Sequence, residues 1–241
     1  MPHSIAPAEA LERRQRGGDA HTAVVTSRQS LIDDLEVAIT RRDIASRAEI
    51  LRRITDLFAA GSVSFGSEQT SLFDDVMGRL VSEIDHSARA AFGERIARLS
   101  NTPPKITREL ALDDSIDVAG SVLKRSECLD EDTLIIGAKT KSQDHLFAIS
   151  QRSKLSENVT DVLVERGDQK VVISTAANAG ARFSDFGYTK LVSRSKNDGE
   201  LALLVWAQPE IPREYLLTLF EAASETVQRR FEAADRSKAD L

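Results

Sequence analysis

Cysteine and aromatic residues are scarce in this sequence, and each scarcity excludes a class of protein. Cys128 is the single cysteine among 241 residues. The chain therefore has no second thiol for an intramolecular disulfide, and too few for a metal or cluster site with several cysteine ligands. Aromatic residues make up only 5%, which is low for a β-sandwich or barrel, whose strands favour aromatic and β-branched side chains.

Long apolar runs and an excess of positive charge are also missing. No stretch approaches the roughly 18 apolar residues of a membrane span, and the first residues include no secretory hydrophobic segment, so we expect a cytoplasmic protein. The formal net charge is −6. Nucleic acid is therefore not the expected partner, because its binding depends on neutralising phosphates. The content of 41% hydrophobic and 29% charged residues indicates a soluble globular protein.

The first 27 residues carry prolines, glycines and a basic cluster, but few apolar side chains. The basic cluster consists of Arg13, Arg14 and Arg16. The stretch 8–16 lacks an apolar stripe wide enough to pack against another element. We therefore predict a flexible N-terminal tail over residues 1–27, in preference to a docking peptide.

Apolar residues recur at helical spacing from residue 28 to residue 100. This periodicity predicts an N-terminal helical part, residues 28–100, that belongs to one elongated array. The predicted helices cover 31–39 with Ser30 as cap, Ile44 to Gly61, a third helix opened by Ser67, and 88–99, which either continues the third or forms a fourth.

From Pro103 onward the sequence repeats itself with a period of about 26–28 residues. Pro103-Pro104 resembles a divergent first copy, because proline is tolerated in the first turn of a helix. Four apolar anchors each precede a residue placed to begin a helix: Leu129, Leu155, Phe183 and Ile211. Eight and nine residues after the last three anchors stand further apolar pairs, which are Leu163-Val164, Leu191-Val192 and Leu219-Phe220.

Each repeat has room for two short helices. Polar joints between copies, such as Asp113-Asp114-Ser115, offer Ser or Asp as caps. Two helices of about ten residues and two turns fill about 27 positions, and neither helix buries its stripe without a neighbour. We therefore predict an all-α fold, a right-handed α-α superhelix (an α-solenoid), with helical repeats over 101–221. Residues 222–241 are assigned to a C-terminal capping helix and tail. The predicted terminal helix itself runs from Tyr215 to Phe231, so it begins within the last repeat.

Three segments of the chain, residues 110–135, 139–168 and 175–192, resemble a bacterial family. They are similar to domain-of-unknown-function family 2336, and the resemblance extends over about residues 31–220. It implies HEAT-like or leucine-rich-variant helical repeats, which agrees with an α-solenoid, and it supplies no catalytic residues. Ala179 departs from the family pattern, which has a proline there.

No cluster of residues has the pattern of a catalytic or metal site. Cys128 stands among Glu127, Asp130 and Glu131, whose charges disfavour a reactive thiolate, so we interpret it as a small packing residue. The histidines lack a second ligand at a zinc-site spacing, and surface or helix-terminal positions are expected for them. They are His3, His21, His86 and His145. We predict no catalytic, cofactor-binding or metal-binding residue and no cofactor.

Acidic pairs occur at four predicted helix starts or exposed faces. Capping and the helix dipole explain them, although paired carboxylates also serve in acid–base chemistry. The pair Asp113-Asp114 lies where the N-terminal helices meet the repeats, and a role beyond capping stays open for it. Trp206 is predicted to lie in the core, and Gly180 to end a helix in the left-handed conformation. The four pairs are Asp33-Asp34, Asp74-Asp75, Asp113-Asp114 and Glu131-Asp132.

Two functions fit these patterns. The first is a non-catalytic binding or scaffold module that recognises a partner protein through the concave surface of the solenoid. The alternative is an enzyme on a HEAT-like scaffold, either a DNA-repair glycosylase or a chromophore lyase, because one fold hosts many activities. The absence of catalytic motifs favours the binding module. The sequence names neither the partner nor the oligomeric state.

Overall fold

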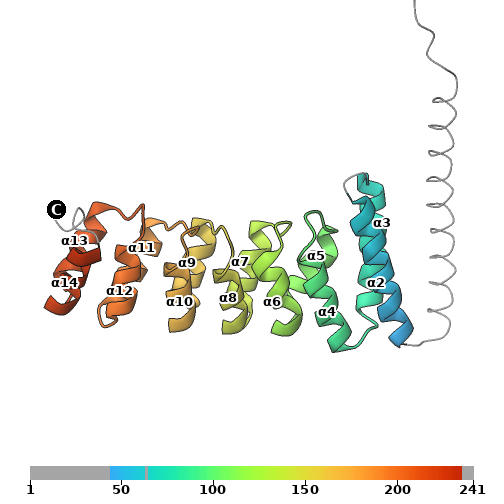
Figure 1. The fold of residues 1–241 in the computed structure, drawn as a ribbon, viewed down its shortest axis with the longest axis horizontal. Helices are drawn as coiled ribbons and strands as arrows, with labels where there is room; N and C mark the ends of the chain where they lie inside the picture. Colours follow the sequence, from blue (N-terminus) through green and yellow to red (C-terminus); the bar gives the residue numbers. More distant parts are fainter. Residues whose placement is uncertain (1–43, 63–64, 235–241) are drawn as a thin grey trace, which may run out of the picture.

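The computed structural model describes residues 44–62 and 65–234, and within these ranges it is helical with no strand (Figure 1). The all-α prediction is confirmed for this part of the chain. The predicted tail (1–27) and the predicted helix over 31–39 lie outside the described residues. The helices are α2 (Ile44–Gly61), α3 (Ser67–Val81), α4 (His86–Ile96), α5 (Pro104–Ala111), α6 (Ile116–Arg125), α7 (Glu131–Thr140), α8 (Gln143–Ser150), α9 (Glu157–Arg166), α10 (Gln169–Ala176), α11 (Asp185–Ser195), α12 (Gly199–Trp206), α13 (Arg213–Ala222) and α14 (Glu225–Ala234).

The helices form two rows that follow the long axis of the molecule in chain order (Figure 1). In the first row, α4, α6, α8, α10, α12 and α14 each contact the next member. In the second row, α5, α7, α9, α11 and α13 do the same. Each helix therefore packs mainly on its predecessor and successor in its own row, and on the neighbouring helix of the other row.

The second row has the spacing that the sequence predicts. Its helices α7, α9, α11 and α13 begin at Glu131, Glu157, Asp185 and Arg213, so their starts are 26, 28 and 28 residues apart. Helix α5 begins at Pro104 as the earlier copy. The predicted apolar pairs of α9 and α11 are buried, and in α13 Leu219 is buried while Phe220 is partly exposed.

The first row departs from a constant register. Its helices α6, α8, α10 and α12 begin 27, 26 and 30 residues apart. The position six residues before an anchor is expected to be apolar and buried, and before Phe183 this residue is Ala177. In the structure, however, Ala177 is exposed and caps the end of α10. The loop before α11 (177–184) is longer than the loop before α9 (151–156), and this difference shifts the register.

The predicted terminal helix, Tyr215 to Phe231, is wrong because the stretch forms two helices. Ala223 has an extended backbone (φ −80°, ψ 146°) and separates α13 from α14. The break lets α14 pack against α12, where the ring of Phe231 stacks on Trp206 at a centroid distance of 4.4 Å. Both rings are at most 1% exposed, so aromatic burial compensates for the interrupted helix. The core position predicted for Trp206 is confirmed.

One prediction at a helix end is confirmed and another needs correction. Helix α3 begins at Ser67 as predicted, and its N-cap Gly66 donates its N–H to the side chain of Gln69. Gly180 does not adopt the left-handed conformation. A Cβ at this position would clash with the carbonyl oxygen of Ser153, so glycine is required by a close approach of two loops.

Two sets of loops connect the rows, at opposite ends of the helices. We call the loops that lead from the first row to the second the outbound loops, and those that lead back the return loops. The outbound loops are 126–130, 151–156, 177–184 and 207–212, and the return loops are 112–115, 141–142, 167–168 and 196–198.

Side chains of the outbound loops cap first-row helices of the preceding unit. The Arg152 guanidinium donates to the carbonyl oxygens of Leu123 and Ser126, at 2.6 and 2.8 Å, at the end of α6. The Asn178 amide donates to the carbonyls of Ser150 and Arg152, at 2.9 and 2.7 Å, after α8. These bonds satisfy carbonyls that a helix end leaves without an intrahelical partner.

The second row uses arginine in the same way near the return loops. Arg194 of α11 donates to the carbonyl oxygens of Val164 and Gly167, at 3.1 and 2.9 Å, at the end of α9. Arg166 of α9 donates to the carbonyl of Ala138 at the end of α7. A cation at a helix C-terminus also complements the helix dipole. Successive units are therefore joined by hydrogen bonds as well as by apolar packing.

Candidate binding surface

The histidine and cysteine candidates of the sequence have structural contacts. His145 begins α8, as expected for a helix-terminal histidine, but it is only 1% exposed. Its Nε2 lies 3.0 Å from the carbonyl oxygen of Asp113, and its Nδ1 lies 2.7 Å from Oγ of Ser142. Nε2 therefore donates, and Nδ1 accepts from the hydroxyl, so the ring joins two return loops. The Cys128 Sγ donates to the carbonyl of Ser100 at 3.4 Å.

The pair Asp113-Asp114 also joins neighbouring units. An oxygen of Asp113 accepts from the N–H of Ser115 at 2.8 Å, and the other lies 3.6 Å from the Arg89 guanidinium. Asp114 pairs with the Lys141 ammonium at 2.6 Å, and the pKa of its carboxyl is lowered, mainly by this hydrogen bond and then by the charge of Lys141. The two carboxylates thus face different partners.

Buried Asp74 shows how an acidic residue of one helix caps another. Its oxygens accept from the backbone N–H groups of Lys105 and Ile106, at 2.9 and 2.7 Å, in the first turn of α5.

Across the described ranges, no three His, Cys, Asp or Glu side chains converge on a position for a metal ion. The described helices include none that is long and apolar enough to cross a membrane.

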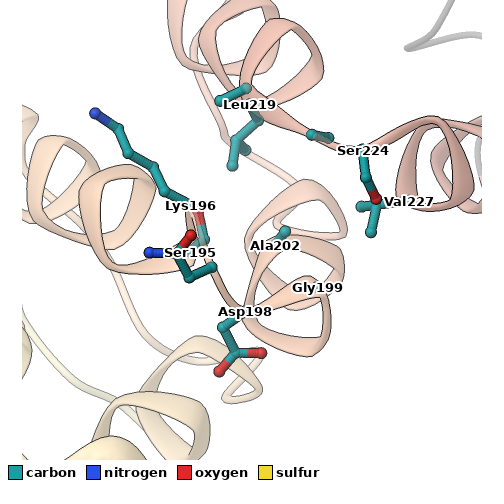
Figure 2. Close-up of a pocket in the computed structure, with 11 residues that line it drawn as sticks. Ser195, Lys196, Asp198, Gly199, Ala202, Leu219, Ser224 and Val227 are labelled. Carbon is teal, nitrogen blue, oxygen red and sulfur yellow. The ribbon is translucent and has the colours of Figure 1, made fainter.

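A small pocket of about 240 Å³ lies between the last return loop and the turn that joins α13 to α14 (Figure 2). Its wall mixes polar residues with apolar ones such as Ala202, Leu219 and Val227. Figure 2 shows the Lys196 chain extending away from this wall and the Asp198 carboxylate turned away from Leu219. Asp198 is already occupied, because it caps α12 and accepts from Gln169.

A larger cavity of about 590 Å³ lies among three outbound loops, and we call it the outbound cavity. Loops 151–156 and 177–184 pair there, because Leu155 N–H donates to Gly180 and Arg182 N–H donates to Leu155, each at 3.0 Å. The third wall comes from the loop before α13. The cavity is lined by Lys154, Leu155, Ser156, Glu157, Ala179, Gly180, Ala181, Arg182, Phe183, Asp185, Tyr188, Gln208, Pro209, Glu210 and Pro212.

Five charged side chains line the outbound cavity, and none of them forms an ion pair or hydrogen bond with another described residue. Three are carboxylates and two are cations: Glu157, Asp185, Glu210, Lys154 and Arg182. Glu157 and Asp185 are the first residues of α9 and α11, where a carboxylate also complements the helix dipole. The charge of this cavity is therefore available to a ligand.

Tyr188 of α11 lines the same cavity and is 5% exposed. Its ring packs between Phe183 and Tyr215, with centroid distances of 5.5 and 5.3 Å. Burial raises the pKa of the Tyr188 hydroxyl to about 12, with smaller contributions from Glu210 and Glu157. The hydroxyl forms no hydrogen bond with another residue of the described structure. It is thus a neutral hydrogen-bonding group at the cavity, on a largely buried side chain, with no partner among the described residues.

Large exposed apolar side chains lie on second-row helices and on α3. Ile136 of α7, Phe186 of α11 and Leu217 of α13 are 36%, 42% and 42% exposed, and we call these three residues the second-row face. Leu72 of α3 is 65% exposed. Acidic residues predominate among the exposed charges of α7, α9, α11 and α13. The acids are Glu131, Asp132, Glu157, Glu165, Asp185, Glu214 and Glu221, against Lys139, Arg166 and Arg213.

Neither the outbound cavity nor the second-row face was identified from the sequence. The cavity depends on three loops that are about 25 residues apart in the chain and of unequal length, so no local motif marks it. The second-row face, in contrast, could have been found by comparing equivalent positions of the repeats. Phe186 and Leu217 stand at positions where the equivalent residues of α9 are Asn158 and Asp161, and an apolar residue at a solvent-facing position indicates a contact surface.

Comparisons with known proteins identify a family and little else. No curated protein and no solved structure matches the chain. A family model matches residues 118–241, from the third residue of α6 to the last residue of the chain. The match begins later than the resemblance seen in the sequence and extends beyond it. It covers about half of the chain, including most of the repeated helix pairs. The chain therefore belongs to the family described as uncharacterised protein conserved in bacteria (DUF2336).

Proposed function

We propose that this protein is a non-catalytic, cytoplasmic scaffold that binds a partner protein on the second-row face. In this proposal the two rows form a right-handed, HEAT-like superhelix, and the second row lines its concave side. The single observation that carries the proposal is the distribution of exposed large apolar side chains. Those of the repeats lie on α7, α11 and α13, and none lies on the described first-row helices.

The packing between units supports a scaffold role. The C-terminal ends of α6, α7, α8 and α9 are tied to the next unit by the side chains of Arg152, Arg166, Asn178 and Arg194. Apolar contacts between successive helices run the length of the array. A repeat array fixed in this way holds its outer residues at constant distances, which suits recognition of an extended surface.

The charges of the second row indicate the chemistry of the partner. Acidic side chains outnumber basic ones among the exposed charges of α7, α9, α11 and α13, although the Lys190 ammonium lies 5.1 Å from the centroid of the Phe186 ring. A partner with apolar anchors flanked by lysine or arginine complements this surface. Phe186 and Leu217 are the expected anchoring positions, because α11 and α13 are neighbours in the row.

The test compares the double variant Phe186→Ser/Leu217→Ser with Leu72→Ser, which removes a more exposed apolar side chain on α3, outside the second-row face. Partners captured from the native cell are purified and titrated calorimetrically against each full-length variant. We expect the double variant to lose at least about tenfold in affinity, since each apolar anchor contributes about 1.5–3 kcal/mol when buried. Leu72→Ser should bind like the wild type.

Two results would contradict the proposal. One is a captured protein that binds the double variant as tightly as the wild type. The other is turnover of a substrate by the purified chain, such as base excision from DNA, that persists in the double variant. Circular dichroism of both variants controls for loss of helix.

A further inference from the structure

We propose that the outbound cavity binds an arginine side chain presented by a peptide segment of the partner. This inference rests on the proposed function, because it names the chemistry by which a partner segment would be recognised. It concerns a different part of the array from the second-row face, namely the outbound loops before α9, α11 and α13. The two sites can therefore be tested independently.

The charge of the cavity favours a cation. Three carboxylates line it against two cations, and all five lack partners among the described residues. The ion pairs of the described chain show that charged side chains near one another usually do pair between units, as Lys141 does with Asp114. Carboxylates without a partner, at a concave and partly desolvated position, are stabilised most by a cationic ligand that donates hydrogen bonds to them.

Tyr188 is the second, independent feature of the site. The residue is only 5% exposed and lines the cavity, and its hydroxyl has no hydrogen-bond partner in the described structure. Glu210 and Glu157 both contribute to the raised pKa of this hydroxyl, after burial. A neutral phenol near carboxylates accepts a hydrogen bond from a cationic donor through its oxygen and donates its proton to a carboxylate or carbonyl.

Arginine suits this arrangement better than a point charge. Its planar guanidinium carries five N–H donors in a fixed geometry, enough to reach Glu157, Glu210 and the Tyr188 oxygen together. The largely buried rings of Phe183 and Tyr188 contribute an apolar wall to the cavity, which partly desolvates a bound guanidinium. Lys154 and Arg182 remain at the cavity for carbonyl or carboxylate oxygens of the same peptide.

The cavity is large enough for more than one side chain. Its volume is about 590 Å³, and it is bounded by three loops together with the first turns of α9 and α11. Loops 151–156 and 177–184 already pair by backbone hydrogen bonds, as two strands do. A short extended peptide, with its arginine in the cavity, is therefore the class of ligand that the shape admits.

The experiment titrates the full-length protein with three blocked peptides and follows backbone amide NMR signals. The peptides are acetyl-Gly-Gly-Arg-Gly-Gly-amide, the same peptide with citrulline, and the same peptide with glutamate. Citrulline has the shape of arginine without its charge. We expect saturable shifts at 154–157, 179–185 and 208–212 with arginine, and at least about tenfold weaker binding of citrulline, because charge-assisted hydrogen bonds are lost.

Variants assign the effect to the named groups. Glu157→Gln/Glu210→Gln should weaken arginine-peptide binding at least about tenfold, and Tyr188→Phe by a smaller factor of roughly two to five. Glu232→Gln, an exposed carboxylate of α14, is the matched control and should change nothing. Circular dichroism and the unaffected amide signals show whether each variant is folded.

The proposal is overturned if citrulline binds as well as arginine, if the glutamate peptide binds most tightly, or if the shifts lie outside the three loops. Absence of saturable shifts would also overturn it. Failure here is distinguishable from failure of the scaffold function. Phe186→Ser/Leu217→Ser should bind the arginine peptide like the wild type, while Glu157→Gln/Glu210→Gln reports on the cavity alone.

Discussion

The return loops and the outbound loops join the same two rows of helices, yet they use their polar residues differently. At the return loops before α6, α8 and α10, several side chains bond to neighbouring units. Gln143 donates to the carbonyl of Arg166 and accepts from the N–H of Asp168, and Lys141 pairs with Asp114. Along the outbound loops, Arg152 and Asn178 are occupied in the same way.

The difference appears around the outbound cavity, where five charged side chains and the Tyr188 hydroxyl have no partner within the described structure. A repeat array needs hydrogen bonds between units to satisfy its many helix ends. Once these ends are satisfied, further polar groups are free for other molecules. Under the proposed function, polar groups that bond between units stabilise the array, whereas polar groups without a partner among the described residues are available for binding.

The largest expected change in stability distinguishes two arginines of the outbound loops, Arg152 and Arg182. Arg152→Met should lower the free energy of unfolding by about 2–4 kcal/mol, because two buried carbonyl oxygens lose a charged donor. Arg182→Met should change it by no more than about 0.5 kcal/mol, because its side chain has no partner. Urea unfolding followed by circular dichroism measures both, and similar effects of the two variants would contradict the distinction.

Burial also perturbs Arg152 in the direction expected for an internal cation. Desolvation lowers the pKa of its guanidinium, and the charge of Glu127 opposes this only in part. Its role could not be inferred from the sequence. Arg152 follows α8 and caps α6, so its partners lie 26 and 29 residues away and appear only when the units are stacked.

The repeat itself was predictable because it depends on local spacing. The anchors Leu155, Phe183 and Ile211 are buried, and the helices that follow them begin two residues later, as the sequence indicates. The first row was harder, since its register depends on loop lengths. The 30-residue step between α10 and α12 places Trp206 where Ala176 stands one unit earlier, and there the larger ring stacks on Phe231 of α14.

The next effect concerns the close approach of two outbound loops. Gly180→Ala should cost about 2–3 kcal/mol of stability, because the added methyl group collides with the backbone carbonyl of Ser153. Gly78→Ala in α3 is the matched control, since a Cβ there meets only a Glu109 oxygen at 3.9 Å. It should stabilise by about 0.5–1 kcal/mol through helix propensity. Thermal unfolding of both variants checks the sign.

The Gly180→Ala variant also tests whether the loops of the outbound cavity open independently of the rest of the helical array. If Gly180→Ala weakens the pairing of Leu155 with Gly180, amide exchange should accelerate in loops 151–156 and 177–184 before it does so in the return loops. Equal acceleration along the whole chain would show that the two loop sets are not independent.

A smaller effect distinguishes two stacked tyrosines. The Tyr215 hydroxyl donates to the carbonyl oxygen of Asp185 at 3.0 Å, whereas the Tyr188 hydroxyl has no partner. Tyr215→Phe should therefore cost about 1 kcal/mol, and Tyr188→Phe should lie within about 0.5 kcal/mol of the wild type. Chemical denaturation measures the pair under one condition. A larger loss for Tyr188→Phe would mean that its hydroxyl already has an internal partner, which would contradict its availability to a ligand.

The smallest expected effect is the pH dependence of the return-loop pair. The Asp114 carboxyl has a lowered pKa in the folded protein, first through its hydrogen bond with Lys141 and then through the charge of that residue. Its contribution to stability is therefore present above the unfolded pKa of about 3.9 and is lost as the pH falls through the lower folded value. The difference in Tm between wild type and Asp114→Asn should accordingly shrink on acidification. In a Lys141→Gln background this difference should be small at every pH, because the main cause of the shift is gone. A pH-dependent difference that survives in that background would assign the shift to another neighbour and weaken the contrast between paired return loops and the unpaired cavity.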